Sequence, residues 1–311
     1  MGAEIAASLN ITMPVFFMMM LGVLFRRLGW MTEKFARDLN GFVFRIPLPV
    51  SIFMQLYRAD FLSVWDMPFV LFCFLVTLAQ ILIAVVLSLL IRKHELRGEF
   101  VQASYRSSTA LLGLTYLQQA YNSASASAFM MVGCVPLYNV AAVILLNQKE
   151  GKGRAVRASL VKSILLNPII LGIVLGFIFT YLHIQLPGIL EKTASNVGAL
   201  ASPAGLMAMG ASIDFRKLGD RAKQILSASA LKLVVFPALF LPLAVHLGYR
   251  GEKLMALLIM TGSATTVASY VMAKQQGCEG ELTAGSVMLT TLLTSVTLTV
   301  FIFVMKHMGL L

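Results

Sequence analysis

Long apolar segments alternate with short polar breaks along the whole chain. Each has roughly the 20 residues that an α-helix needs to cross about 30 Å of hydrocarbon at about 1.5 Å per residue. We predict ten transmembrane helices, approximately at residues 4–25, 37–57, 67–91, 98–120, 127–146, 159–182, 188–212, 224–247, 252–274 and 282–305. No segment between them is long enough for a soluble domain. The expected fold class is an all-α polytopic membrane protein.

Prolines, glycines and charged residues recur in the second half of the chain at a nearly fixed spacing. Five residues recur 154 positions later and an Arg-Gly-Glu triplet recurs 153 positions later: Pro14 as Pro168, Gly22 as Gly176, Pro49 as Pro203, Asp60 as Asp214, Phe61 as Phe215, and Arg97-Gly98-Glu99 as Arg250-Gly251-Glu252. This period is too long for a solenoid. We predict two five-helix repeats, 1–150 and 151–311. Because five is odd, the second repeat is inverted, and the expected binding site lies at the midplane where discontinuous helices of both repeats meet.

Composition supports the membrane assignment, and the charge pattern gives an orientation. Hydrophobic residues make up 58% of the chain and charged residues 13%, with a mean hydropathy of +0.83. The net charge of +11 could indicate nucleic acid, but Lys and Arg concentrate in alternate loops. By the positive-inside rule those loops face the cytoplasm and both termini lie outside. We expect a multi-pass protein of the cytoplasmic (inner) membrane, surrounded by lipid and without a nucleic-acid partner.

Other chemistry is sparse in the sequence. Cys73, Cys134 and Cys278 suggest neither a disulfide framework nor a metal cluster. The first apolar segment lacks a basic n-region and a convincing cleavage site, so we interpret it as an uncleaved helix. No catalytic constellation lies at a common depth, and there is no P-loop. We predict neither an enzyme nor a primary pump, and no cofactor or metal.

The fourth and ninth segments have polar centres and are the predicted discontinuous helices. Hydroxyls and glycines there can satisfy or expose freed backbone groups, which is tolerated only beside protein or a water-filled cavity. The alternative for each hydroxyl is a bond back to its own helix. The candidate substrate-binding residues are Arg106, Ser107, Ser108, Thr109 and Gly113 in the fourth segment and Thr261, Ser263, Thr265, Thr266 and Ser269 in the ninth, with Gly262 as a helix break.

Prolines also interrupt the second and seventh segments. Proline removes a helical N–H donor and clashes with the preceding turn, which predicts kinks. Pro14 and Pro168 lie near helix starts, and we interpret them as architectural. Pro47, Pro49 and Pro203 are candidate hinges that line the cavity.

Three basic residues fall within apolar segments. Arg45 lies near enough to the cytoplasmic end for its side chain to snorkel. Arg106 and Lys232 each lie about 13.5 Å into a segment, near the bilayer centre. A charge there costs at least about 3 kcal/mol and needs a partner. All fourteen acidic residues lie in loops or near segment ends, so no carboxylate is available at that depth.

Other groups can take the place of the missing carboxylate. For Lys232, backbone carbonyls can serve. For Arg106 we predict a substrate anion, because guanidinium binds carboxylate in a bidentate fork and the N-terminal ends of half-helices add positive potential. Asn139, deep in the fifth segment, offers donors and acceptors either to a polar solute or to another helix.

Four motifs spread over nearly the whole chain: Val135-Pro-Leu-Tyr-Asn139, Asn167-Pro168-Ile-Ile-Leu-Gly172, the stretch from Pro203 to Ala211, and Ser269-Tyr-Val-Met-Ala-Lys274 leading to Glu281-Leu282. Together they resemble the auxin efflux carrier family, which includes plant auxin exporters and bacterial malate and malonate carriers. The resemblance implies ten helices in two repeats, with the broken fourth and ninth helices crossing. It also implies an elevator-like mechanism in which helices 3–5 and 8–10 move as a transport domain against a scaffold of helices 1, 2, 6 and 7.

Two positions depart from the family pattern. Ser108 stands where the family commonly has Asn, and Ala264 where it commonly has Pro. These departures leave open a less sharply broken crossover and a different substrate. Carried over by the resemblance, the candidate site residues are Ser108, Gly113, Asn139, Thr265 and Ser269.

The predicted function is secondary transport of a small organic anion, with a carboxylate expected. Arg106 would pair with the anion, while Lys232 would add positive potential or brace the crossover. The absence of embedded carboxylates favours uniport; coupling to protons through Lys232, or to sodium held by carbonyls and hydroxyls, is one alternative. A non-transporting sensor or scaffold with the same fold is another. The sequence names neither the anion nor the oligomeric state, for which a homodimer is one candidate.

Overall fold

The computed structural model describes residues 14, 17–58, 66–109, 117, 121, 125–146, 167–212 and 215–311. Every regular element within these ranges is helical. Six helical stretches are long and apolar enough to cross a membrane: Glu33–Tyr57, Met67–Ser88, Phe129–Leu146, Ala222–His246, Gly251–Gln275 and Glu281–His307. The expected all-α, multi-pass architecture is therefore confirmed. Parts of the first, fourth and sixth predicted segments lie outside the described ranges, so the count of ten stays a prediction.

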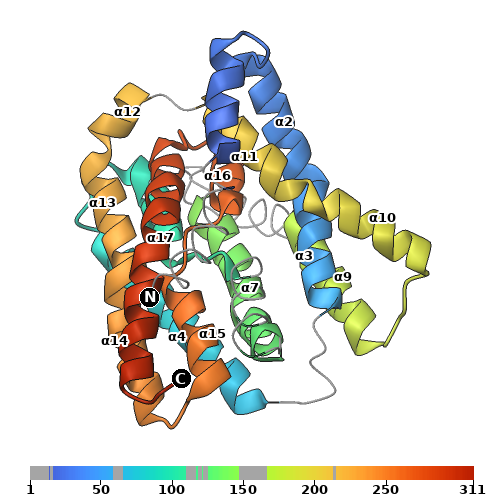
Figure 1. Ribbon diagram of the computed structural model, residues 1–311. Helices are drawn as coiled ribbons and strands as arrows, with labels where there is room; N and C mark the ends of the chain where they lie inside the picture. The colour runs from blue at the N-terminus through green and yellow to red at the C-terminus, as the bar shows by residue number, and fades with distance from the viewer. Residues whose placement is uncertain are drawn as a thin grey trace, which may run out of the picture.

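The helices follow one another in the order shown in Figure 1. They are α2 (Glu33–Arg45), α3 (Pro47–Tyr57), α4 (Met67–Ser88), η1 (His94–Leu96), α5 (Arg97–Tyr105), α7 (Ser125–Leu146), α9 (Pro168–Tyr181), α10 (Gly188–Ala199), α11 (Ala201–Ser212), α12 (Phe215–Asp220), α13 (Ala222–Ala230), η3 (Leu231–Val235), α14 (Phe236–His246), α15 (Gly251–Gly262), α16 (Val267–Gln275) and α17 (Glu281–His307). Residues 17–27 are also helical.

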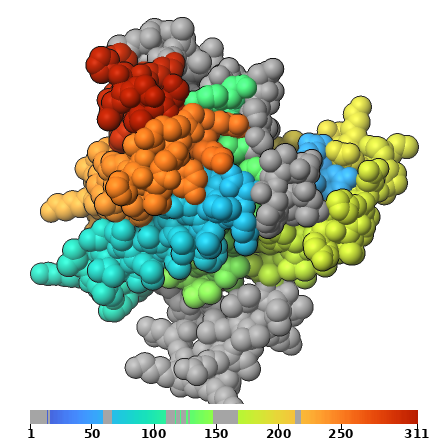
Figure 2. Space-filling model, turned by 90° about the horizontal axis from the view of Figure 1, so that it is seen from below, coloured from blue at the N-terminus to red at the C-terminus, as the bar shows by residue number. Residues whose placement is uncertain are grey.

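Contacts divide these helices into two groups. In the first group, α3 packs on α9 and α10, and α2 packs on α11. In the second, α4 packs on α5 and α7, α13 on α17, and α14 on α15. Figure 1 shows the first group on the right and the second on the left, and Figure 2 shows α9 and α10 to one side of the larger body. Contacts of α16 with α2 and α11, and of α7 with α9, join the groups.

Glycines permit close helix contacts inside the first group. A Cβ atom at Gly210 would lie 2.0 Å from the backbone oxygen of Met19, and one at Gly22 would lie 2.2 Å from that of Met207. Helix 17–27 and α11 therefore pack backbone against backbone, as small residues allow in membrane proteins.

Both segments in which prolines predict a kink contain a helix break. Ile46, at φ −124° and ψ −69°, separates α2 from α3 directly before Pro47. Leu200 separates α10 from α11, so this break precedes Pro203 instead of lying at it. Pro49 lies in the first turn of α3, where a missing N–H donor costs no intrahelical bond.

Two glutamates hold helix N-termini in an equivalent way. Glu99, near the start of α5, accepts hydrogen bonds from the backbone N–H groups of Gly280 and Thr283 at the start of α17, at 3.0 and 3.2 Å. Glu252, near the start of α15, accepts one from Ala126 at the start of α7, at 3.0 Å. A carboxylate at a helix N-terminus offsets the positive end of the helix dipole. Each matched Arg-Gly-Glu triplet thus ties its helix to a helix of the other half of the chain.

A candidate anion site where two broken helices meet

Two helix breaks touch at the centre of the protein. α5 ends at Tyr105, and the chain continues in extended backbone from Arg106. α15 ends at Gly262, and α16 begins only at Val267. The backbone N–H of Ser108 donates to the carbonyl of Ala264 at 2.9 Å. We call residues 106–108 and 263–266 the crossover; both stretches lie in the hydroxyl-rich centres noted in the sequence.

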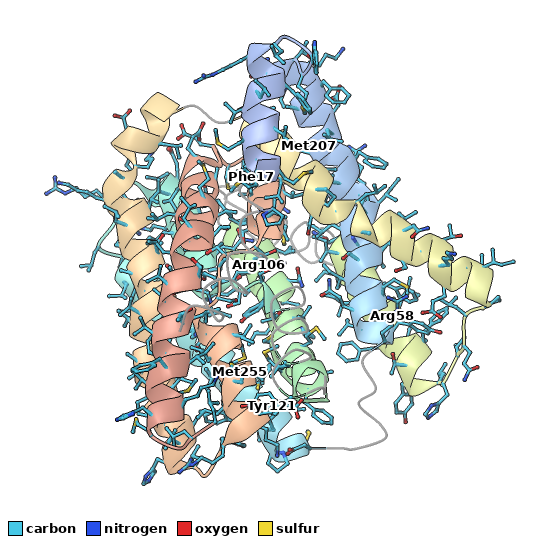
Figure 3. The ribbon with its side chains drawn as sticks, viewed as in Figure 1. Phe17, Arg58, Arg106, Tyr121, Met207 and Met255 are labelled. Carbon is cyan, nitrogen blue, oxygen red and sulfur yellow. The ribbon has the colours of Figure 1, made fainter. Side chains whose placement is uncertain are left out.

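A cavity of about 460 Å³ lies between the crossover and the first helix group. One wall consists of α3, α10 and α11, and the other of α7, α16 and crossover residues. Arg106 lies near the middle of the molecule in Figure 3 and is only 4% exposed, yet it lines the cavity. The volume of the cavity falls within the range of small-molecule sites.

The Arg106 guanidinium is held by neutral acceptors. One terminal nitrogen donates to the Asn139 side-chain oxygen at 2.8 Å, and the other contacts the Tyr138 carbonyl at 3.4 Å and the Met272 sulfur at 3.3 Å. Its Nε has no partner. Within the described part of the chain, no carboxylate forms an ion pair with Arg106. A buried cation with a spare donor therefore borders a cavity.

The N-terminus of α16 faces the same cavity. Thr266 is its N-cap residue, and Thr266, Val267 and Ala268 all line the cavity. The Thr266 side chain makes no capping bond. The first N–H groups of a helix lack intrahelical partners and carry the positive end of its dipole. This helix end adds positive potential to that of Arg106.

The structure separates the candidate residues that line the cavity from those that do not. The candidates that line the cavity are Arg106, Ser107, Ser108, Thr109, Asn139, Thr266 and Pro203. Thr261 bonds back to the Leu257 carbonyl at 2.7 Å, and Thr265 donates to the Ala103 carbonyl at 2.9 Å. The residues that do not line the cavity are Ser263, Ser269, Thr261, Thr265, Pro47 and Pro49. Gly113 lies outside the described residues.

Lys232 lies beside the crossover and is fully buried. Its ammonium donates to the carbonyls of Tyr105, Met260 and Thr261 at 3.1, 3.2 and 3.2 Å, and to the Ser107 hydroxyl. It is not among the cavity-lining residues. Of the two roles considered for Lys232, bracing the crossover is the one that these contacts support.

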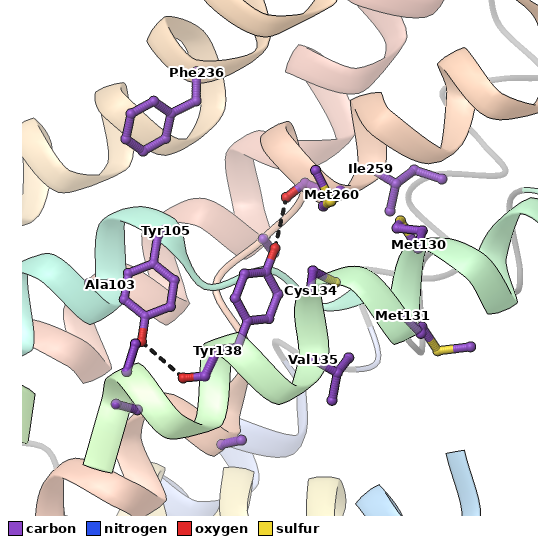
Figure 4. Close-up of a cluster of buried hydrophobic side chains, with 14 of the residues drawn as sticks. Ala103, Tyr105, Met130, Met131, Cys134, Val135, Tyr138, Phe236, Ile259 and Met260 are labelled. Carbon is purple, nitrogen blue, oxygen red and sulfur yellow. Dashed lines mark hydrogen bonds between the residues drawn. The ribbon is translucent and has the colours of Figure 1, made fainter. Parts of the chain in front are cut away.

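Gly262 and two tyrosines, Tyr105 and Tyr138, hold together the helices around Lys232. A Cβ atom at Gly262 would lie 2.6 Å from Cγ of Pro237, so a larger residue would separate α15 from α14. Figure 4 shows the Tyr105 hydroxyl donating to the Tyr138 carbonyl, and the Tyr138 hydroxyl donating to the Met260 carbonyl, at 3.0 and 3.3 Å. These bonds link α5, α7 and α15 beside the cavity.

Sequence reasoning missed the polar residues on the opposite wall. Ser51, Gln55 and Ser202 line the cavity from α3 and α11, and the Gln55 amide donates to the Ser51 hydroxyl at 3.2 Å. Ser51 and Gln55 are spaced i, i+4 and therefore share one helix face. That spacing of two polar residues in an apolar segment was the signal that could have found them.

The family of the protein follows from comparison with known proteins. A family model described as membrane transport protein (Mem_trans) matches residues 9–302. The chain belongs to this family. The resemblance to auxin efflux carriers is thereby confirmed, and the family points to transport and not to catalysis.

Curated relatives are distant but match along almost their whole length. An "Uncharacterized transporter" of Methanothermobacter thermautotrophicus is 22% identical over 94% of this chain and 96% of its own length. A Rhizobium meliloti protein named "Putative malonate transporter" is 21% identical over 96% of this chain and 95% of its own. The chain is thus similar to membrane transporters from end to end.

Proposed function

We propose that the protein is a secondary transporter that carries a small organic anion with a carboxylate group across the cytoplasmic membrane. The observation that carries the proposal is Arg106, a buried guanidinium that lines the cavity, keeps an unpartnered Nε and forms no ion pair among the described residues. A carboxylate would supply the missing negative charge and accept two N–H bonds from the fork. The relative named as a malonate transporter supports the same substrate class.

The proposed binding mode uses both positive features of the cavity. Arg106 binds one carboxylate, with the guanidinium held in place by Asn139 at 2.8 Å. The N-terminus of α16 lies at the cavity, with Thr266 as its N-cap residue, and attracts the same negative charge. Ser51 and Gln55, on the opposite wall, bind the other polar end of the anion. The anion thus bridges the two helix groups.

Alternating access is proposed to follow an elevator-like mechanism. The scaffold comprises helix 17–27, α2, α3, α9, α10 and α11, and the transport domain comprises α4, α5, α7 and α13–α17. The separation of contacts into these groups, with the cavity between them, supports this division. The reciprocal ties of Glu99 and Glu252 to helices of the other half support the inverted repeat. We place the basic loops in the cytoplasm and both termini outside.

The test measures the binding of radiolabelled malonate and acetate to the protein, and their flux into liposomes that contain it. We expect Arg106→Ala to weaken binding by about 100-fold or more, which corresponds to about 2.7 kcal/mol or more. This loss lies within the roughly 2–5 kcal/mol that truncating one partner of a buried charged pair costs. Arg45→Ala is the matched control, because Arg45 is exposed and does not line the cavity. Unchanged binding and flux in Arg106→Ala would refute the site. Binding without flux in the wild type would identify a sensor instead.

A further inference from the structure

Lys232 occupies a ring of oxygen atoms that resembles a cation site. Four oxygens lie within hydrogen-bond distance of its ammonium: the carbonyls of Tyr105, Met260 and Thr261, and the Ser107 hydroxyl. An ammonium has three N–H donors, one fewer than the acceptors around it. None of the four ligands is charged. Such a set of neutral oxygens suits a monovalent cation.

Two helix C-termini supply the three carbonyl oxygens. Tyr105 is the last residue of α5, and Met260 and Thr261 lie in the last turn of α15. The last carbonyls of a helix lack intrahelical partners, and each helix end carries about half a negative charge. Two such ends amount to about one negative charge, which one monovalent cation balances. In other carriers, half-helix C-termini and unwound carbonyls bind sodium in this way.

A local irregularity of the helix aims Lys232 at this position. Residues Leu231–Val235 form the π-helical turn η3, in which the Phe236 N–H bonds to the Leu231 carbonyl. Pro237 follows, and it cannot donate the N–H that the next α-helical bond would need. π-turns in helices are frequent at functional sites. The ring also adjoins the cavity, because Ser107 both lines the cavity and bonds to the ammonium.

We propose that the oxygen ring formed by Tyr105, Ser107, Met260 and Thr261 is a monovalent-cation site that the Lys232 ammonium fills permanently. The tethered charge does the work of a coupling ion without entering or leaving. The protein therefore needs no sodium or potassium for stability or transport. When the amine is removed, the ring accepts a cation from solution. Only the consequence for flux rests on the proposed function; cation binding by the ring does not.

The test compares the thermal stability of Lys232→Ala, Lys232→Met and wild type in NaCl, KCl, methylammonium chloride and choline chloride. We expect about 100 mM Na⁺, K⁺ or methylammonium to raise the unfolding midpoint of Lys232→Ala by about 3 °C or more relative to choline, which is too large for the ring. Lys232→Met fills the vacated space with an apolar chain and gains nothing. The wild type is equally stable in all four salts.

Transport provides the second measurement. Wild-type flux of malonate or acetate is expected to be the same in sodium, potassium and choline salts, and the same small cations are expected to restore flux to Lys232→Ala. Wild-type stability or flux that requires sodium would overturn the proposal. So would a Lys232→Ala protein that is equally unstable in every salt, or one that matches the wild type in choline. Cation-dependent stability without any flux would retain the site and count against the transport function alone.

Discussion

Two buried cations lie on opposite sides of the crossover and have opposite surroundings. Lys232 faces the C-terminal ends of α5 and α15 and has an acceptor for every proton. Arg106 faces a cavity beside the N-terminal end of α16 and has an unpartnered Nε. Two helix C-termini thus surround the saturated cation. The unsaturated cation directly follows the C-terminus of α5 but shares its cavity with the N-terminus of α16. Burial alone therefore does not mark a candidate binding residue; spare hydrogen-bonding capacity next to a cavity does.

The largest expected effect is a reciprocal pattern in Arg106→Met and Lys232→Met. Arg106→Met should lose anion binding by about 100-fold or more while retaining most of its stability. Lys232→Met should lower the unfolding midpoint far more, because the buried carbonyls of Tyr105 and Thr261 lose their donor, at a cost of about 1–3 kcal/mol each. Thermal unfolding and isothermal titration of purified protein measure both quantities. Equal losses of stability in the two variants would contradict the distinction between the two cations.

A smaller effect is expected at the residue that positions Arg106. Asn139→Leu removes the 2.8 Å hydrogen bond to the guanidinium, and we expect about tenfold weaker anion binding, the equivalent of about 1.4 kcal/mol. Asn40→Leu is the matched control, because Asn40 is buried but does not line the cavity. Titration with malonate measures the difference. Equal weakening in both variants would assign Asn139 to packing alone.

A still smaller effect is expected on the opposite wall. Gln55→Leu removes a polar group from the cavity, which should weaken binding about fivefold, the value of roughly one neutral hydrogen bond. Gln80→Leu is the control, because Gln80 is buried in α4 away from the cavity. An anion that binds Gln55→Leu as tightly as the wild type would show that only the Arg106 side of the cavity holds it.

The smallest expected effect concerns a thiol outside the membrane spans and tests how strongly burial suppresses its ionisation. Cys278 lies in the loop between α16 and α17, where burial, with a contribution from Glu99, raises the pKa of its thiol to about 12. Because the thiolate is the reactive form, the alkylation rate of a protein that retains only Cys278 should keep rising tenfold per pH unit from about pH 8 to pH 10. The unfolded protein should instead level off near pH 9. A plateau near pH 9 in the folded protein would contradict the shift.

Much of the architecture was predictable because its causes are local. Apolar length marks the membrane spans, and Pro47 marks the break at Ile46. Runs of hydroxyl residues marked both halves of the crossover, because such side chains accompany interrupted helices. Arg106 and Lys232 were found from depth alone, since a charge in the middle of an apolar segment is costly.

The separate roles of the candidate residues were not predictable in the same way. Thr261, Thr265 and Thr266 look alike in sequence, but only Thr266 lines the cavity. Which hydroxyl faces inward depends on where α15 stops and α16 begins. The wall formed by Ser51 and Gln55 was missed for a related reason, because it requires α3 to pack across the cavity from α7 and α16.

The order of residues along the chain was enough to predict a membrane protein with two interrupted helices and two basic residues at mid-depth. Hydrophobicity and helix-breaking chemistry act over a few residues and can be read in order along the chain. Helix packing then encloses Lys232 between helix C-termini and turns Arg106 toward a cavity. Helix ends, glycine contacts and a π-turn, distant in sequence, set the electrostatic surroundings of each charge.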